Sequence, residues 1–174
     1  MKKSILLIIV YFGIINFISA QTVKWYTFEE AVELNKIKPK KILIDVYTDW
    51  CGWCKVMDKN TFSHPVIAKY LNMNFYPVKF NAESKEPVKF MGQTYKNEGN
   101  GSRSTHQLAY ALLNGKLSYP SIAYMDGKNK LITAVPGYWP AEKIEPLLQF
   151  FVDEVYKTSR SFDDYTNNYK SKIK

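Results

Sequence analysis

The sequence has 174 residues, of which 46% are hydrophobic and 23% are charged, so its composition excludes a mostly disordered chain and fits one globular domain. Its formal net charge is +8 at pH 7, but no basic motif with interleaved aromatic residues accompanies this charge, and we expect no nucleic-acid partner. We interpret the charge as a solvated cationic surface, with weak attraction to anionic membranes or acidic partners as the alternative.

Residues 1–20 have the pattern of a secretory signal peptide. Lys2 and Lys3 precede an apolar run that ends at Ala20, a small residue suited to cleavage. The run is shorter than the ~20 residues that cross a bilayer, so an uncleaved membrane anchor is the less favoured alternative. Cleavage would leave a net charge of +6 and would place the protein in the periplasm of a bacterium or outside the cell.

The rest of the chain alternates between strand and helix patterns. Thr27 and Glu30 form a capping box before a helical stripe, and residues 41–48 form a nearly continuous apolar run typical of a strand buried on both faces. In chain order, we predict strands over 23–26, 41–48, 74–81, 120–125 and 130–135, and helices over 28–35, 56–61, from 65 onward, 83–90, 105–113 and 140–156. This order predicts an α/β fold with one domain over 21–156, in which helices flank a central mixed β-sheet.

Two segments fall outside this alternation. Residues 91–104 are rich in Gly, Asn and Ser and are long for a connection, so we expect an extra loop on the surface. Residues 157–174 are polar, and we expect a loosely held C-terminal tail.

Both cysteines of the chain lie in the stretch "DWCGWCK" (49–55), where three interpretations compete. A structural staple is disfavoured, because a disulfide between Cys51 and Cys54 closes a very small loop and such loops gain the least stability. A tetrahedral metal site needs four ligands, and the chain offers only His64 and His106 besides the two cysteines. We therefore assign no metal and no other cofactor, and expect the two histidines at a helix start and on the surface, respectively.

The third interpretation is a redox pair, and the position of the cysteines favours it. Cys51 follows a predicted buried strand and begins a helix, where unpaired N–H groups and the helix dipole favour a thiolate. Cys54 lies one turn further on, within disulfide reach but deeper inside. An exposed Cys51 would attack a partner disulfide, and the inner Cys54 would resolve the mixed disulfide.

The stretch "ILIDVYTDWCGWCK" (42–55) resembles the active-site strand and helix start of the thioredoxin superfamily, with Asp45 as the acid in the strand and Trp50 before the cysteines. The continuation "TFSHPVIAKYLNMNFYPVKFN" (61–81) is similar to the exported branch that includes the periplasmic C-terminal domain of the transmembrane disulfide reductase. The resemblance covers roughly 28–151, is strong around the cysteines and weakens across 83–104. It implies a single thioredoxin-like domain with an extra loop insertion.

The resemblance also implies roles for residues away from the cysteines. Tyr119-Pro120 matches a cis-proline that faces the disulfide, with Tyr119 lining the substrate groove. Lys79 matches a lysine near the acid of the strand. Trp50 and Trp53 would contact the substrate, and in this family the intervening pair, Gly52 and Trp53 here, tunes the redox potential.

Asp45 has two interpretations of its own. A lone charged acid in an apolar strand is costly to bury without a partner. We expect Asp45 to accept the proton of Cys54, directly or through water, with a pKa raised by burial. The alternative is a partly solvated acid at the end of a strand.

These observations predict an exported thiol–disulfide oxidoreductase that reduces or isomerises disulfides in protein substrates, with a membrane reductase as electron donor. Two alternatives remain at this point. One is a disulfide-forming oxidase, and the other is a protein-binding module in which residues 91–104 dock a partner and the cysteines act as a switch.

Overall fold

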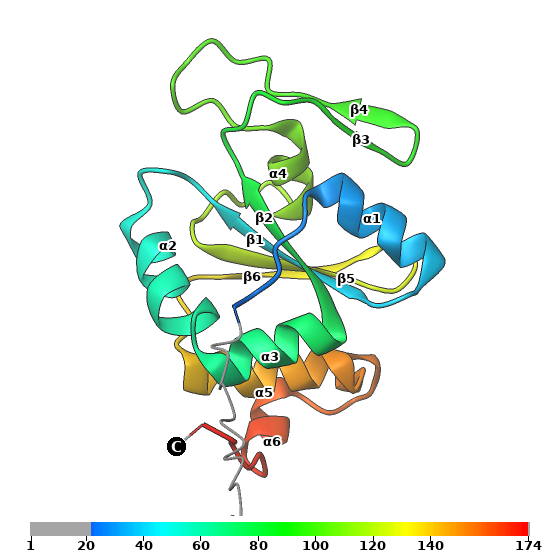
Figure 1. Ribbon diagram of the computed structural model, residues 1–174, viewed down its shortest axis with the longest axis vertical. Coiled ribbons are helices and arrows are strands. Elements are labelled where there is room, and N and C mark those ends of the chain that lie inside the picture. Colours follow the sequence, from blue (N-terminus) through cyan, green and yellow to red (C-terminus); the bar gives the residue numbers. More distant parts are fainter. Residues whose placement is uncertain (1–21, 174) are drawn as a thin grey trace, which may run out of the picture.

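A four-stranded mixed sheet forms the centre of the protein, shown as a computed structural model that describes residues 22–173 (Figure 1). The strand order is β2-β1-β5-β6, with β1 parallel to β2 and antiparallel to β5, and β5 antiparallel to β6. The strands span Lys41–Tyr47 (β1), Phe75–Asn81 (β2), Ser121–Met125 (β5) and Leu131–Pro136 (β6). The predicted α/β fold with a central mixed sheet is confirmed.

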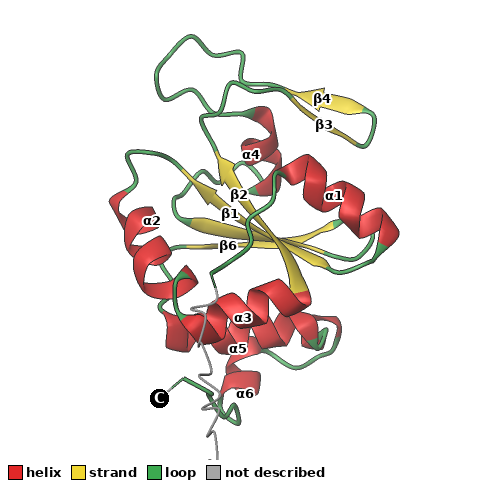
Figure 2. Cartoon of the chain, in the orientation of Figure 1, coloured by secondary structure: helices red, strands yellow, loops and turns green. Residues whose placement is uncertain are grey.

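Helices cover both faces of this sheet (Figure 2). Helices α1 (Phe28–Ile37) and α4 (Gln107–Leu112) contribute buried residues to one apolar cluster. Helices α2 (Gly52–Met57), α3 (Pro65–Asn74) and α5 (Ala141–Val152) contribute to a second cluster on the opposite face. A short π-helical segment, η1 (Asp58–Phe62), continues α2 without a break.

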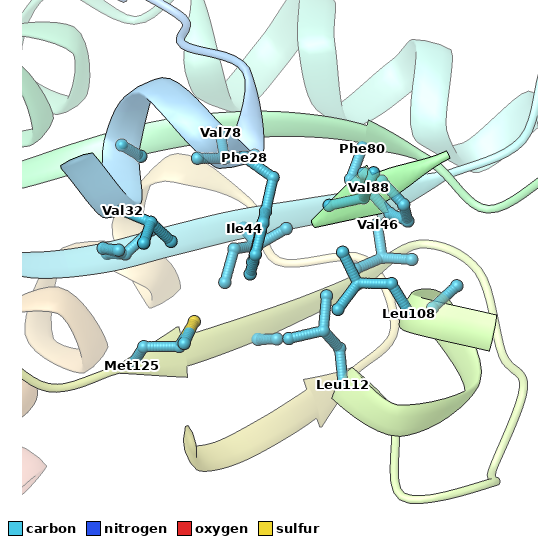
Figure 3. Packing of buried hydrophobic residues seen from close by; sticks show 14 of the residues in the cluster. Phe28, Val32, Ile44, Val46, Val78, Phe80, Val88, Leu108, Leu112 and Met125 are labelled. Carbon is cyan, nitrogen blue, oxygen red and sulfur yellow. The ribbon is translucent and has the colours of Figure 1, made fainter. Parts of the chain in front are cut away.

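The alternation of side chains along β1 determines on which face of the sheet Asp45 lies. Ile44 and Val46 belong to the cluster under α1 and α4 (Figure 3), whereas Leu43 belongs to the cluster under α2, α3 and α5. Because successive side chains of a strand point to opposite faces, Asp45 shares the face of Leu43. The carboxyl therefore points toward the layer that contains α2, the helix that carries Cys54.

Helix starts follow the sequence signals closely. Thr27 Oγ1 accepts a hydrogen bond from the N–H of Glu30 at 3.2 Å, and the Glu30 carboxylate accepts one from the N–H of Thr27 at 2.8 Å. This reciprocal pair is the predicted capping box. At α3, His64 occupies the N-cap position and Pro65 the first turn, as the sequence predicts.

The first and third predicted strands differ from expectation. The strand predicted over 23–26 is a single parallel bridge between Tyr26 and Val78. Strand β2, predicted as a central strand, lies at the edge of the four-stranded sheet. Pro77 fits there because an edge strand has backbone groups without ladder partners, and its carbonyl accepts the N–H of Tyr26 at 2.8 Å.

The helix predicted over 83–90 is wrong. Residues of this region form a β-hairpin instead, with β3 (Val88–Phe90) antiparallel to β4 (Gln93–Tyr95). Its two turn residues, Met91 and Gly92, both have positive φ angles, of 49° and 78°. Positive φ angles are typical of two-residue hairpin turns, because the backbone twist of such turns matches the twist of the flanking strands.

The C-terminal segment is attached to the domain more firmly than expected. The helix predicted over 140–156 ends at Val152, and a 3₁₀ turn (η2, Val155–Lys157) and a helix (α6, Phe162–Thr166) follow. The ring of Phe162 packs against Phe150 at 5.5 Å between centroids. The buried carboxylate of Glu145 accepts the N–H of Lys172 at 2.9 Å. Residues 157–173 therefore cover part of α5 and do not form a loose tail.

The predicted signal peptide, residues 1–20, lies outside the described residues, and its assignment stays a prediction. Across 22–173, every helix is too short or too polar to cross a bilayer.

Candidate active site

The two cysteines form a disulfide at the start of α2. Their sulfur atoms are 2.10 Å apart, and their Cα atoms are 5.3 Å apart. Cys51 is the N-cap of α2, and its Sγ accepts the N–H of Cys54 at 3.1 Å. This N–H is one of those that a helix leaves without an intrahelical partner, so it is available to stabilise negative charge on Cys51.

The expected difference in exposure between the two cysteines is not present. The exposed fractions of Cys51 and Cys54 are 4% and 2%, so both are buried. In the disulfide the two sulfur atoms are bonded, and the two residues therefore share one environment. A partner thiol must pass the side chains around the disulfide to reach it, so these side chains control access to the sulfur atoms.

Two exposed tryptophans belong to these surroundings. Trp50 is 51% exposed, and its ring lies edge-on to Tyr119 with centroids 6.1 Å apart. Trp53 is 61% exposed and packs against Tyr138 at 5.3 Å, in the segment between β6 and α5. Gly52 between the cysteines is exposed, and a Cβ added there would meet open space, so packing does not require a glycine.

The Tyr119-Pro120 peptide bond is cis. It precedes β5, whose first residue, Ser121, pairs with Val46 near the end of β1. The cis peptide therefore lies at the end of the sheet from which the chain continues to Cys51. The carbonyl of Pro120 accepts the N–H of Gly137 at 2.8 Å, and Gly137 has a φ of 91°, which favours glycine.

Asp45 and Lys79 form an ion pair on the α2 face of the sheet. The two residues are register partners on β1 and β2, and Lys79 Nζ lies 2.6 Å from Asp45 Oδ2. Asp45 is 1% exposed, and its Oδ1 atom has no hydrogen-bond partner in the described part of the chain. Burial raises the pKa of Asp45 to about 6, although the Lys79 ammonium opposes the shift. Asp45 is a fully buried acid, which excludes the alternative of a solvated acid at a strand end.

Lys79 has a second carboxylate partner, Asp58, in η1. The ammonium also lies 4.8 Å from the ring centre of Tyr47. Burial alone would lower the pKa of Lys79, but Asp45 and Asp58 outweigh it and raise the pKa above its usual value. Lys79 is therefore a cation that links a buried carboxylate to one with a side chain 44% exposed.

The sequence did not indicate four neighbours of this site. Asp58 and Tyr138 stand in segments without a recognisable motif, Glu83 lies in the segment for which the sequence predicts a helix, and Arg103 lies in the predicted surface loop over 91–104. Only the path of the chain brings these side chains to Lys79, Trp53 and Trp50.

His106 is not a surface residue, in contrast to the sequence-based expectation. It is fully buried, and its Nδ1 atom accepts the N–H of Leu108 at 3.0 Å, which caps α4. Its ring lies edge-on to Phe80 at 5.3 Å. No group of three or more His, Cys, Asp and Glu side chains within 22–173 is arranged to hold a metal ion.

The chain is similar to known proteins in sequence and in fold. The family model of the thioredoxin-like domain matches residues 28–151. The thiol:disulfide interchange protein DsbD of Pectobacterium atrosepticum is 27% identical over 116 residues, which are 65% of this chain and 17% of that protein. The uncharacterized protein B0495.5 of Caenorhabditis elegans is 36% identical over 67 residues, which are 38% of this chain and 9% of that protein. The chain thus spans less than a fifth of the length of these curated relatives.

Solved structures show the same fold. A putative disulphide-isomerase from Bacteroides thetaiotaomicron has a TM-score of 0.53 and 21% identity, covering 82% of this chain and 98% of that chain. The DsbH oxidoreductase also has a TM-score of 0.53, with 20% identity, covering 80% of this chain and 86% of that chain. With the family model matched over most of the described residues, the chain belongs to the thioredoxin-like domain family.

Proposed function

We propose that the protein is an exported thiol–disulfide oxidoreductase that reduces or isomerises disulfides in protein substrates. The observation that carries this proposal is the Cys51–Cys54 disulfide at the start of α2, with the N–H of Cys54 directed at Cys51 Sγ. A thiolate at a helix start is stabilised by such donors and by the helix dipole, which activates it as a nucleophile. The similarity to thiol:disulfide interchange and oxidoreductase proteins supports the same chemistry.

The first chemical step uses the reduced protein. The Cys51 thiolate attacks one sulfur of a substrate disulfide, a new bond forms between Cys51 and that sulfur, and the substrate S–S bond breaks. The second substrate sulfur leaves as a thiolate with the electron pair of the broken bond. The product is a mixed disulfide between the protein and its substrate.

The second step returns the disulfide of the structure. Cys54 loses its proton and attacks Cys51 Sγ, and the remaining substrate sulfur leaves as a thiolate. The Cys54 proton needs an acceptor, and Asp45 supports this role because it faces the α2 layer with a pKa near neutrality. In total, two electrons pass from the protein to the substrate, and an external dithiol must replace them.

The surroundings of the disulfide fit recognition of an extended polypeptide. Trp50 and Trp53 provide exposed aromatic surface, and Tyr119 with the cis-Pro120 lies next to Trp50. Aromatic side chains offer large contact areas to a bound chain at low entropic cost. We propose these four residues as the substrate-contacting set, and the exposed Gly52-Trp53 pair as the segment that tunes the redox potential.

The predicted signal peptide supports a periplasmic or secreted location, and an exported protein of this kind needs reducing equivalents from the membrane. We therefore propose a membrane disulfide reductase as electron donor. The experiment that tests the function is reduction of insulin disulfides with dithiothreitol, followed by turbidity. We expect the wild type to accelerate the reaction and Cys51→Ser to abolish the acceleration, and equal rates would refute the proposal. Circular dichroism of both proteins serves as the control for folding.

The reduction potential of the cysteine pair distinguishes a protein that reduces disulfides from one that forms them. Equilibration with glutathione redox buffers gives the reduction potential of the Cys51–Cys54 pair. A potential near or below that of the glutathione pool supports reduction, whereas a strongly oxidising potential would favour the disulfide-forming alternative. A Cys54→Ser variant should accumulate mixed disulfides with substrates, because the resolving thiol is absent.

A further inference from the structure

The segment between β4 and α4 passes beside Trp50, and side chains hold it in place. Asn97, 8% exposed, donates from Nδ2 to the carbonyl of Glu83 at 3.0 Å and to that of Ser104 at 2.7 Å. Lys85 Nζ donates to the carbonyl of Gly99 and to Ser104 Oγ, both at 2.7 Å. This segment forms the loop at the top of Figure 1 and is anchored at both ends.

This anchored loop places Arg103 over the tryptophan that precedes the disulfide. The guanidinium carbon of Arg103 lies 4.9 Å from the ring centre of Trp50, a cation–π contact. The indole N–H of the tryptophan is also held in place, because Trp50 Nε1 donates to Glu83 Oε1 at 2.8 Å. The loop therefore adds a positive charge to the edge of the substrate-contacting surface.

The charge of Arg103 is available to a ligand. Arg103 is exposed, and it has no ion pair within residues 22–173. Glu83 accepts the indole N–H of Trp50, Asp49 accepts the side-chain amide of Asn81 at 3.1 Å, and neither carboxylate forms an ion pair with Arg103. A guanidinium stacked on an aromatic ring keeps N–H donors at its edge for a carboxylate.

We infer that Arg103 selects disulfide substrates that carry an aspartate or glutamate close to the reactive cysteine. The inference rests on the proposed function and names its substrate class. Trp50 directly precedes Cys51, so the guanidinium is within about two or three extended residues of the sulfur that would be attacked. An acidic side chain at that separation can reach Arg103 while the substrate cysteine is bonded to Cys51.

The experiment uses three peptide disulfides that differ at one position two residues from the cysteine, with Asp, Asn or Lys. The reduced wild-type protein is mixed with each peptide in a single turnover, and the second-order rate constant for oxidation of the protein is measured. We expect roughly a two- to fivefold preference for Asp over Asn, the effect of one exposed charge pair, and a lower value for Lys. The preference should fall as salt is added, because exposed charges are screened.

Arg103→Gln is the decisive variant and should bring the Asp-to-Asn ratio close to one. Lys96→Gln removes an equal charge from the same loop and leaves the cation–π contact of Arg103 with Trp50 in place, so it should keep the wild-type ratio. A ratio near one in the wild type, or a ratio that persists in Arg103→Gln, would overturn the inference while leaving the oxidoreductase function intact. If the wild type reduced none of the three peptides, the proposed function itself would fail, and the inference with it.

Discussion

Lys79 Nζ lies 2.6 Å from Asp45 Oδ2, so the buried acid beneath the cysteine helix is paired with a cation from the neighbouring strand. The same ammonium contacts Asp58, which reaches the solvent. Burial and one carboxylate oppose ionisation of Asp45, and Lys79 favours it. The protonation of Asp45 therefore depends on two neighbours that can be altered separately.

Asp45→Asn should stabilise the protein at pH 7 and have little effect near pH 3. The folded pKa of about 6 lies above the value of 3.8 for a free Asp, so between these pH values the folded state holds the proton more tightly. Stability from this group is present below pH 4 and is lost as the pH rises through 6. This difference between the folded and free pKa values corresponds to about 3 kcal/mol of unfolding free energy at neutral pH. Urea unfolding at the two pH values measures it, and an equal effect at both would contradict the assignment.

The same substitution should slow resolution of the mixed disulfide. Because we propose that Asp45 accepts the Cys54 proton, removal of this carboxylate should slow the resolution step about 10²-fold. The inflection near pH 6 in the plot of that rate against pH should also disappear. Stopped-flow measurement of mixed-disulfide decay against pH tests this. Asp163→Asn, in α6 far along the chain, is the control and should keep the wild-type profile.

Substitutions of Lys79 and of Asp58 should move the pKa of Asp45 in opposite directions. Lys79→Gln removes the opposing cation and should raise the pKa above about 6, whereas Asp58→Asn removes a repelling charge and should lower it. Carbon NMR titration of the Asp45 carboxyl measures both shifts. The phenol of Tyr47, which also faces this group, stays neutral throughout the titration because its own pKa is raised by burial. Shifts of the same sign in both variants would refute this electrostatic account.

His106→Ala should destabilise the fold by about 3 kcal/mol, because it leaves a cavity and removes the acceptor that caps α4. His106→Asn keeps a capping acceptor and should recover part of the loss. Burial lowers the pKa of His106, so the unfolded chain takes up a proton below about pH 6.5 that the folded protein does not. Wild-type stability from this group therefore falls on acidification, and thermal unfolding of His106→Asn should show a weaker fall.

The sequence predicts the parts of this protein that follow local rules. The Thr27–Glu30 capping box, the apolar run of β1 and the placement of Cys51 at a helix start each depend on a few adjacent residues, and each is present in the structure. The cis bond before Pro120 and the pairing of Lys79 with Asp45 came from the resemblance to a family. Spacing alone does not encode either feature.

The failures share one physical origin, which is tertiary contact. The hairpin over residues 88–95 packs on the domain through the buried Val88 and through Phe90, whose ring contacts Phe28, and the sequence signal at its turn is a single glycine. His106 is buried because the chain folds its ring against Phe80, and residue type does not reveal this because histidine is intermediate in burial. Asp58 and Arg103 reach the site only through the course of η1 and of the loop before α4.

Phe162→Ala tests whether the C-terminal segment belongs to the folding unit. The Phe162 ring packs edge-on against Phe150 and against Trp139, so its removal should cost about 2 kcal/mol of unfolding free energy. Ile37→Ala, at a side chain 83% exposed, is the control and should change stability little. Chemical unfolding followed by tryptophan fluorescence measures both.

The attachment of residues 157–173 to α5 also decides how the protein can be shortened. The family match ends at residue 151, yet Glu145 is buried under the backbone of Lys172, and Phe150 is covered by α6. A protein cut at the family boundary would expose an aromatic patch and leave a buried acid without its partners, so it should self-associate. We therefore expect the smallest fragment of this chain that folds on its own to extend beyond the domain by which its family is recognised.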